Sequence, residues 1–184
     1  MPRTLRLSFF LLVLAAPAFA QQQNVSHAAA TAGPRAVFYT PSDADHGEWG
    51  QGLQVKLPAG PDYAMQVSVD RSKHSAGGAN YKDLPVQVSL LGYFMPESPG
   101  SFYLLVGMGY YRVTVDGPGA HTESSTRPHV GAGLEVLGDG RFSLDASYRF
   151  IWSEVIRMND YGHPWGSGFH ARGSMLTLSV GYRF

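Results

Sequence analysis

The sequence predicts an all-β fold: an eight-stranded antiparallel up-and-down transmembrane β-barrel with short periplasmic turns and longer extracellular loops. Three observations support this fold class. Large apolar residues alternate with small or polar ones along most of the chain, which is the period of a β-strand. Short connections rich in Gly, Pro and Asp alternate with longer polar ones. The 184 residues fit one domain, and beyond the N-terminal segment no apolar run reaches the roughly 20 residues that a membrane helix needs.

The N-terminal segment, residues 1–20, is predicted to be a secretory signal peptide. Two arginines precede an apolar run at 7–16, and the small-residue site Ala-Phe-Ala ends at Ala20, where cleavage is expected. We expect residues 21–34 to be a flexible N-terminus of the mature protein and residues 35–184 to form the barrel.

Each expected strand places bulky apolar side chains on one face and small or polar ones on the other. In chain order the strands are expected at about 35–40, 49–57, 63–70, 86–91, 102–111, 129–136, 142–152 and 176–184. The clearest is "FSLDASYRFIW" at 142–152, where Leu144 and Tyr148 share a face opposite Asp145 and Arg149. The first strand has the weakest alternation.

The connections between these strands alternate strictly between short and long. The short ones are 58–62, 95–100 and 138–141, and the long ones are 41–48, 71–83, 116–127 and 153–172. In an up-and-down sheet this order puts every long loop at one end. Both ends of the barrel segment then lie at the other end, with the short turns.

Alternation alone fits two closures: a soluble lipocalin-type barrel with its apolar face inside, or a membrane barrel with that face outside. An eight-stranded interior has room only for side chains, and the apolar face carries too many aromatic and leucine residues to fit there. In the soluble register Asp145 and Arg149 would have to face outward. If a barrel with that arrangement lay in a membrane, an outward-facing Arg near the midplane would cost roughly 2–4 kcal/mol. The sequence therefore favours an apolar exterior and a small, polar, filled interior.

Aromatic residues are expected to form two girdles on the outer face. The girdle at the short-turn end comprises Tyr63, Phe94, Phe102, Phe142, Tyr182 and Phe184, and the girdle at the long-loop end comprises Tyr39, Trp49, Tyr110, Phe150 and Trp152. From Phe142 to Trp152 the strand rises about 3.3 Å per residue, which at a tilt near 40° projects to about 25 Å. This is the height of the apolar band of an outer-membrane barrel.

The last strand, "LTLSVGYRF", carries alternating apolar residues up to the terminal aromatic: Leu176, Leu178, Val180, Tyr182 and Phe184. With "FYLLVGMGYYRV" and "RFSLDASYRF", this pattern resembles the small outer-membrane β-barrels of Gram-negative bacteria, the group of the OmpA transmembrane domain, OmpX and OmpW. The resemblance covers about 35–184. It implies that the barrel-assembly machinery reads the C-terminal strand, and that the protein contacts outer-membrane lipid and lipopolysaccharide.

Charged residues on the inward face are the first candidate site. The expected lumen polar network comprises Lys56, Glu135, Asp145, Arg149 and Arg183. Charges in a narrow lumen must pair to offset desolvation, so we interpret the network as a plug, with a gated ion path as the alternative. His129 is expected to face inward as a satisfied interior residue.

Two glycine pairs, Gly107/Gly109 and Gly131/Gly133, lie inside strands with no helix following, so they are not phosphate-binding loops. Close packing against bulky inward side chains such as Tyr103 or Tyr111 explains them better.

The fourth long loop contains Asp160, His163, Ser167 and His170, the residue types of a hydrolase or a metal site. A Gly-rich loop holds such a geometry poorly, and the spacing matches no standard metal pattern, so we predict no enzyme activity, no metal and no cofactor. The chain has no cysteine, which excludes disulfides and thiol catalysis. Its zero formal net charge argues against nucleic acid as a partner.

The sequence thus predicts a non-enzymatic outer-membrane barrel with a structural or surface-interaction role carried by polar extracellular loops. A small OmpW-like solute channel and a lipid A-modifying enzyme are the alternatives. The partner of the loops is left open.

Overall fold

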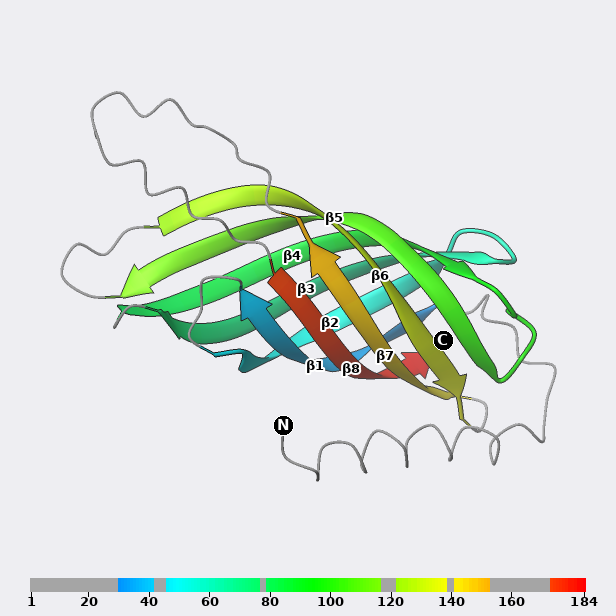
Figure 1. The fold of residues 1–184 in the computed structure, drawn as a ribbon. Coiled ribbons are helices and arrows are strands. Elements are labelled where there is room, and N and C mark those ends of the chain that lie inside the picture. Colours follow the sequence, from blue (N-terminus) through cyan, green and yellow to red (C-terminus); the bar gives the residue numbers. More distant parts are fainter. Residues whose placement is uncertain (1–29, 42–45, 77–78, 117–121, 139–140, 153–172) are drawn as a thin grey trace, which may run out of the picture.

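The computed structural model describes residues 30–41, 46–76, 79–116, 122–138, 141–152 and 173–184. Within these residues eight antiparallel strands pair in sequence order, and the last strand pairs with the first, so the sheet is a closed barrel (Figure 1). This confirms the predicted fold class. The strands are β1 (Thr31–Pro41), β2 (Glu48–Pro58), β3 (Tyr63–Ala76), β4 (Ala79–Tyr93), β5 (Gly100–Asp116), β6 (Thr122–Leu137), β7 (Phe142–Ile151) and β8 (Gly173–Arg183). The described residues include no helix long and apolar enough to cross a membrane.

Alternating burial along the strands confirms which face points inward. In β7, Asp145 and Arg149 are buried while Leu144 and Tyr148 are exposed. The same parity holds in β5, where Tyr103 is buried and Phe102 is exposed. Bulky apolar side chains therefore cover the outside of the barrel, and mostly polar ones fill it.

Four strands, β3 to β6, extend into segments that the sequence predicted to be long loops. The segment 71–83, expected to be a loop, is strand up to Ala76 and again from Ala79. Likewise β5 runs to Asp116 and β6 resumes at Thr122, within the expected loop 116–127. In Figure 1, β3 to β6 reach beyond β1, β7 and β8 at this end. Where their side chains are described, these extensions carry polar residues on their outer face, such as Lys73, Lys82 and Thr126, so the hydrophobic alternation that marks a strand is absent there.

Strand β1 also begins earlier than expected, at Thr31 instead of about residue 35. Thr31 pairs with Lys56 of β2 and Arg183 of β8, so residues 31–34 belong to the barrel wall. The backbone N–H of Phe184 donates to the carbonyl of Ala30 at 3.0 Å, which holds the two ends of the described barrel together at the short-turn end.

Candidate functional site

The barrel interior holds a charge cluster close to the short-turn end. Lys56 of β2 places its Nζ 2.8 Å from Asp145 Oδ2 and 3.2 Å from Glu135 Oε2. The two carboxylates are direct partners on β6 and β7, and like charges in that position destabilise a sheet. The lysine offsets this repulsion. The Tyr93 hydroxyl donates to Glu135 at 2.6 Å and the Tyr103 hydroxyl donates to Asp145 at 2.7 Å.

A second network centres on Arg149, which has 0% exposure. Its Nη1 donates to Gln87 Oε1 at 2.7 Å and its Nη2 donates to Gln66 Oε1 at 2.8 Å. Gln66 donates onward to Gln54 at 2.6 Å, and Gln87 donates to the hydroxyl of Tyr111 at 2.6 Å. Glutamine amides, which both donate and accept, thereby link strands on opposite sides of the barrel.

The predicted five-residue network is therefore divided. The structure brings Lys56, Glu135 and Asp145 together, whereas Arg149 is bonded to glutamines. Arg183 is half-buried at the short-turn end, where it lines a small cavity with Lys56 and Glu135. That cavity offers about 10 Å³ to the centre of a water molecule, about the minimum that holds one water.

An ion pair that sequence reasoning missed joins Arg35 of β1 to Asp70 of β3. Arg35 Nε lies 2.8 Å from Asp70 Oδ1, and both side chains are buried. The strand between them carries Gly52 in register with both residues, and a Cβ there would overlap Asp70 Oδ1. The missing side chain of Gly52 lets the pair meet across β2. The signal that could have predicted this ion pair is an inward-facing glycine flanked, on the two neighbouring strands, by residues of opposite charge.

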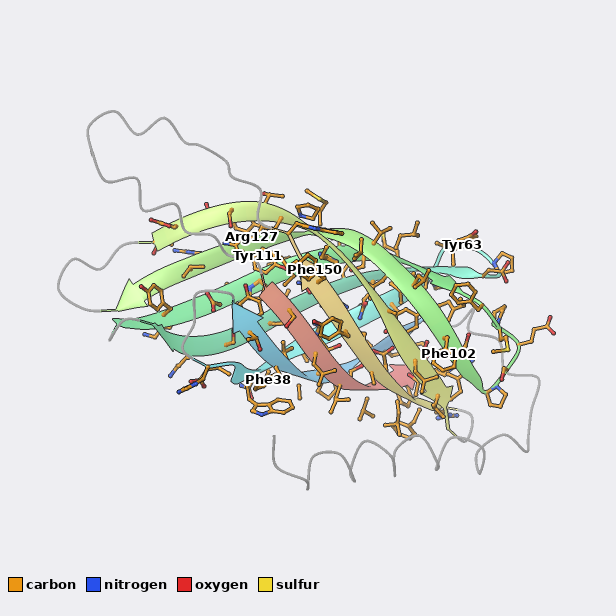
Figure 2. The ribbon with its side chains drawn as sticks, in the orientation of Figure 1. Phe38, Tyr63, Phe102, Tyr111, Arg127 and Phe150 are labelled. Atoms are coloured by element: carbon orange, nitrogen blue, oxygen red, sulfur yellow. The ribbon has the colours of Figure 1, made fainter. Side chains whose placement is uncertain are left out.

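An apolar layer lies between this polar interior and the long-loop end. It comprises Val37, Tyr39, Tyr111, Ile151 and Met175. The guanidinium of Arg127 stands 5.0 Å from the centre of the Tyr111 ring, and Figure 2 labels these two residues on adjacent strands. Side chains thus fill most of the described interior, apart from the small cavity beside Lys56 and Arg183 at the short-turn end.

The inward glycines make room for this filling, as predicted. A Cβ on Gly133 would overlap the Tyr103 ring, and a Cβ on Gly109 would lie 2.6 Å from the Tyr111 ring. Gly107 and Gly131 instead face backbone carbonyls of the neighbouring strands. His129 is fully buried, and its Nε2 lies 2.8 Å from Ser89 Oγ. Its Nδ1 has no hydrogen-bond partner in the described structure. Only one of the two ring nitrogens is therefore hydrogen-bonded, and the prediction that His129 is fully hydrogen-bonded holds only in part.

The outer face carries an apolar belt bounded by aromatic residues at both ends. The exposed aromatic residues at the short-turn end are Tyr63, Phe94, Phe102, Phe142, Tyr182 and Phe184, and those at the long-loop end are Trp49, Tyr110, Phe150 and Trp152. Figure 2 shows Tyr63 and Phe102 near one end and Phe38 outside the wall. The placement of Tyr39 was wrong. It is 4% exposed and faces inward, and Phe38 takes the outer position with its ring centre 5.2 Å from that of Trp49.

The last strand presents its alternating apolar side chains on this outer face. Leu178, Val180 and Tyr182 are exposed on β8, Leu176 is partly exposed, and Phe184 beyond the strand is 78% exposed. The rings of Tyr182 and Phe184 meet edge to face with centres 5.4 Å apart. The candidate loop residues Asp160, His163, Ser167 and His170 lie outside the described residues. Among the described residues no group of three or more His, Asp or Glu side chains could hold a metal ion.

Solved structures of small outer-membrane proteins share this architecture. Neisserial surface protein A superposes with a TM-score of 0.68 at 19% identity, covering 84% of this chain and 97% of that one. The N-terminal β-barrel domain of OprF from Pseudomonas aeruginosa gives a TM-score of 0.55 at 15% identity, covering 89% and 100%. The attachment invasion locus protein Ail of Yersinia pestis gives 0.53 at 19% identity, covering 85% and 97%.

These likenesses show the fold, and the family follows from the sequence itself. Among curated proteins, none matches this chain. A sequence model of the outer membrane protein β-barrel domain matches residues 7–184, nearly the full length. The chain is therefore an integral outer-membrane protein and belongs to the outer membrane protein β-barrel domain family.

Proposed function

We propose that this protein is a non-enzymatic outer-membrane barrel with a closed interior, whose projecting extracellular strands and loops contact partners outside the cell. The observation that carries the proposal is the filled lumen. The Lys56 cluster, the Arg149 network and the apolar layer around Tyr111 each extend across the interior. An eight-stranded barrel has little space beyond its side chains, so a structure packed in this way supports a plug and not a solute path.

The projecting part of the barrel supports the surface role. Strands β3 to β6 extend past the belt as two hairpins with polar outer faces. The neighbour Ail is named for attachment and invasion, and one of its structures is a complex with the heparin analogue sucrose octasulfate (TM-score 0.52, 17% identity). That complex is a precedent for a ligand on a barrel of this fold, and it makes heparin a reasonable first probe of adhesion.

Conductance across a planar bilayer tests the closed interior. We expect the purified mature protein to give no steady single-channel steps. Glu135→Gln and Arg149→Gln variants, checked for folding by heat-modifiable gel mobility, should be equally silent. Steady steps whose size changes with either substitution would instead establish the channel alternative.

Two further measurements test the other parts of the proposal. The lipid A mass spectrum of cells should be the same with the wild type, Ser167→Ala, His163→Ala or no gene, and a gene-dependent mass change would identify an enzyme. Intact cells that carry the protein should adhere to immobilised heparin more strongly than cells in which residues 74–81 are replaced by a short Gly-Ser turn. Equal adhesion of the two strains would count against a surface role for this hairpin.

The terminal strand supports a role in assembly, through the barrel-assembly machinery. Its outer face is apolar from Leu176 to Phe184, and β8 closes the barrel against β1. A strand that closes the sheet and ends in an aromatic residue is suited to recognition by the assembly machinery before the barrel closes, because closure removes its free edge.

A further inference from the structure

The small cavity at the short-turn end lies where the last strand of the barrel meets the first. It offers about 10 Å³ to the centre of a water molecule, and a cavity of this size holds one water when it has polar partners. Its polar walls are formed by Thr31, Lys56, Tyr93, Glu135 and Arg183. A buried water needs two to four polar partners, so these walls provide enough donors and acceptors for one water, and the cavity is too small for a larger ligand.

The register brings three of these residues into one row across the closure of the barrel. Thr31 of β1 pairs with Lys56 of β2 on one side and with Arg183 of β8 on the other, and Figure 1 shows β8 beside β1. Neighbouring strands lie about 4.8 Å apart, so about 10 Å separates the backbones of Lys56 and Arg183. Both residues line the same cavity, so a single water in it lies within reach of both side chains.

The Lys56 cluster carries one more negative charge than positive. Lys56 contributes one positive charge, and Asp145 and Glu135 contribute one negative charge each at 2.8 and 3.2 Å from the lysine Nζ. All three side chains are buried, and an unbalanced charge is costly in such a place. The cluster is therefore stabilised by one further cation at its edge.

Arg183 supplies a cation at that edge, from the strand that closes the barrel. Two other buried arginines have partners elsewhere in the lumen, since Arg35 pairs with Asp70 and Arg149 donates to glutamines. Arg183 is half-buried, and its backbone N–H donates to the carbonyl of Arg141 at 2.8 Å, which holds it at the mouth of the cavity. Before β8 docks on β1, the cluster lacks this cation.

We propose that one water molecule binds in this cavity and joins Arg183 to the Lys56 cluster, so that closure of β8 on β1 brings in the cation that balances the second carboxylate. The water accepts hydrogen bonds from Lys56 and Arg183, and it donates to the Glu135 carboxylate and the Thr31 hydroxyl. This link stabilises the closed barrel at its seam. The proposal depends on the cavity and its charges, and neither on the surface role nor on recognition by the assembly machinery.

A double-mutant cycle tests the charge balance. It uses urea unfolding of the full mature protein in lipid vesicles, which contain no assembly machinery, with heat-modifiable gel mobility as the check of folding. The variants are Arg183→Gln, Glu135→Gln and the two combined. The matched control is Arg141→Gln, which removes an exposed cation at the same end of the barrel, 3.3 Å from the Tyr182 hydroxyl.

Arg183→Gln should raise the equilibrium constant for unfolding about three- to fivefold, the size typical of a partly exposed charge pair. In the Glu135→Gln background Lys56 and Asp145 already balance each other, so the same substitution should change the constant by less than about twofold. Arg183→Lys keeps the charge and should behave like the wild type. Arg141→Gln should have the same small effect in both backgrounds.

Filling the cavity separates a link through water from a direct contact. Ala64 also lines the cavity and is 3% exposed, so Ala64→Val places two methyl groups where the water binds. The coupling between Arg183 and Glu135 should disappear in the Ala64→Val background and persist in Ala64→Gly, which leaves the cavity open. A crystal structure of the wild type should show the water within hydrogen-bond distance of Lys56 and Glu135.

Three results would overturn the proposal. Equal effects of Arg183→Gln with and without Glu135 would show that the arginine does not balance the cluster. Coupling that survives in Ala64→Val would exclude the water as the link, and so would a wild-type crystal structure with no water in the cavity. If Glu135→Gln does not fold, Asp145→Asn leaves the same charge balance and replaces it in the cycle.

Discussion

Replacement of Lys56 by methionine should cost the barrel most of the stability that its interior charge cluster provides. Lys56 Nζ lies 2.8 Å from Asp145 and 3.2 Å from Glu135, with its side chain 4% exposed. Methionine fills a similar volume but carries no charge. The two carboxylates, which are direct partners across β6 and β7, would then be left buried together without the lysine charge, although the hydroxyls of Tyr93, Tyr103 and Ser179 would still donate to them.

The size of the effect follows from the burial of the cluster. Removing one partner of a buried ion pair typically costs about 3–5 kcal/mol, because it leaves an uncompensated charge. Removing every charge is often neutral or stabilising. We therefore expect Lys56→Met to lower the free energy of unfolding by about 3–5 kcal/mol. The triple change Lys56→Met/Glu135→Gln/Asp145→Asn should restore nearly all of this loss, since the amide oxygens still accept from Tyr93 and Tyr103.

Reversible urea unfolding in lipid vesicles measures these free energies, with tryptophan fluorescence as the signal and gel mobility as a check of folding. Arg141→Gln is a surface control that should stay within about 0.5 kcal/mol of the wild type. The reasoning fails if the triple variant is no more stable than Lys56→Met. It also fails if Lys56→Met itself is as stable as the control, because the cluster would then contribute nothing.

Three other predictions use the same unfolding assay or a cell assay. Gly131→Ala should lower the free energy of unfolding by about 1–3 kcal/mol, because its Cβ would overlap the Tyr148 carbonyl. Gly100→Ala should be neutral, because no atom lies within 4 Å of its Cβ. Equal effects of the two substitutions would show that the backbone around Gly131 shifts to accommodate the methyl group. On the outer face, Val106→Arg at mid-belt should cost about 2–4 kcal/mol and Tyr110→Arg near the edge about 0–1 kcal/mol, and the reverse order would mean that the belt is misplaced. Deletion of Phe184 should lower the amount inserted into the outer membrane several-fold while folding into vesicles in vitro stays unchanged, and a parallel loss in vitro would make its role structural.

The barrel itself could be predicted because hydrophobic alternation reports directly on the contrast between the two faces. Along β7 every residue from Phe142 to Ile151 lies on the expected side. The contrast disappears in the extensions of β3 to β6, where the outer face is polar. Residues such as Lys73 and Lys82 therefore read as loop in the sequence, although they pair directly in a hairpin.

The interior pairing could be predicted only in part, because parity says which residues face inward and not which of them meet. Glu135 and Asp145 were expected together because their strands are adjacent, and Lys56 reaches them across the lumen. Arg149 was grouped with them on charge alone, whereas in the structure neutral glutamine oxygens are its partners. Parity also failed at Tyr39, because in the short first strand the alternation was too weak to choose between Phe38 and Tyr39.

Substitutions on the two faces of the barrel wall have different expected consequences. A change to an inward residue such as Glu135 alters the packing of a filled lumen, so it should appear as a change in unfolding free energy. A change to an outward residue such as Arg112 leaves that packing intact, so it should hardly change the unfolding free energy. Because successive residues of one strand face opposite ways, Tyr111 and Arg112 can be compared within a single strand. Tyr111→Phe removes the hydroxyl that accepts from Gln87 and should lower the unfolding free energy, whereas Arg112→Gln should leave it within about 0.5 kcal/mol of the wild type.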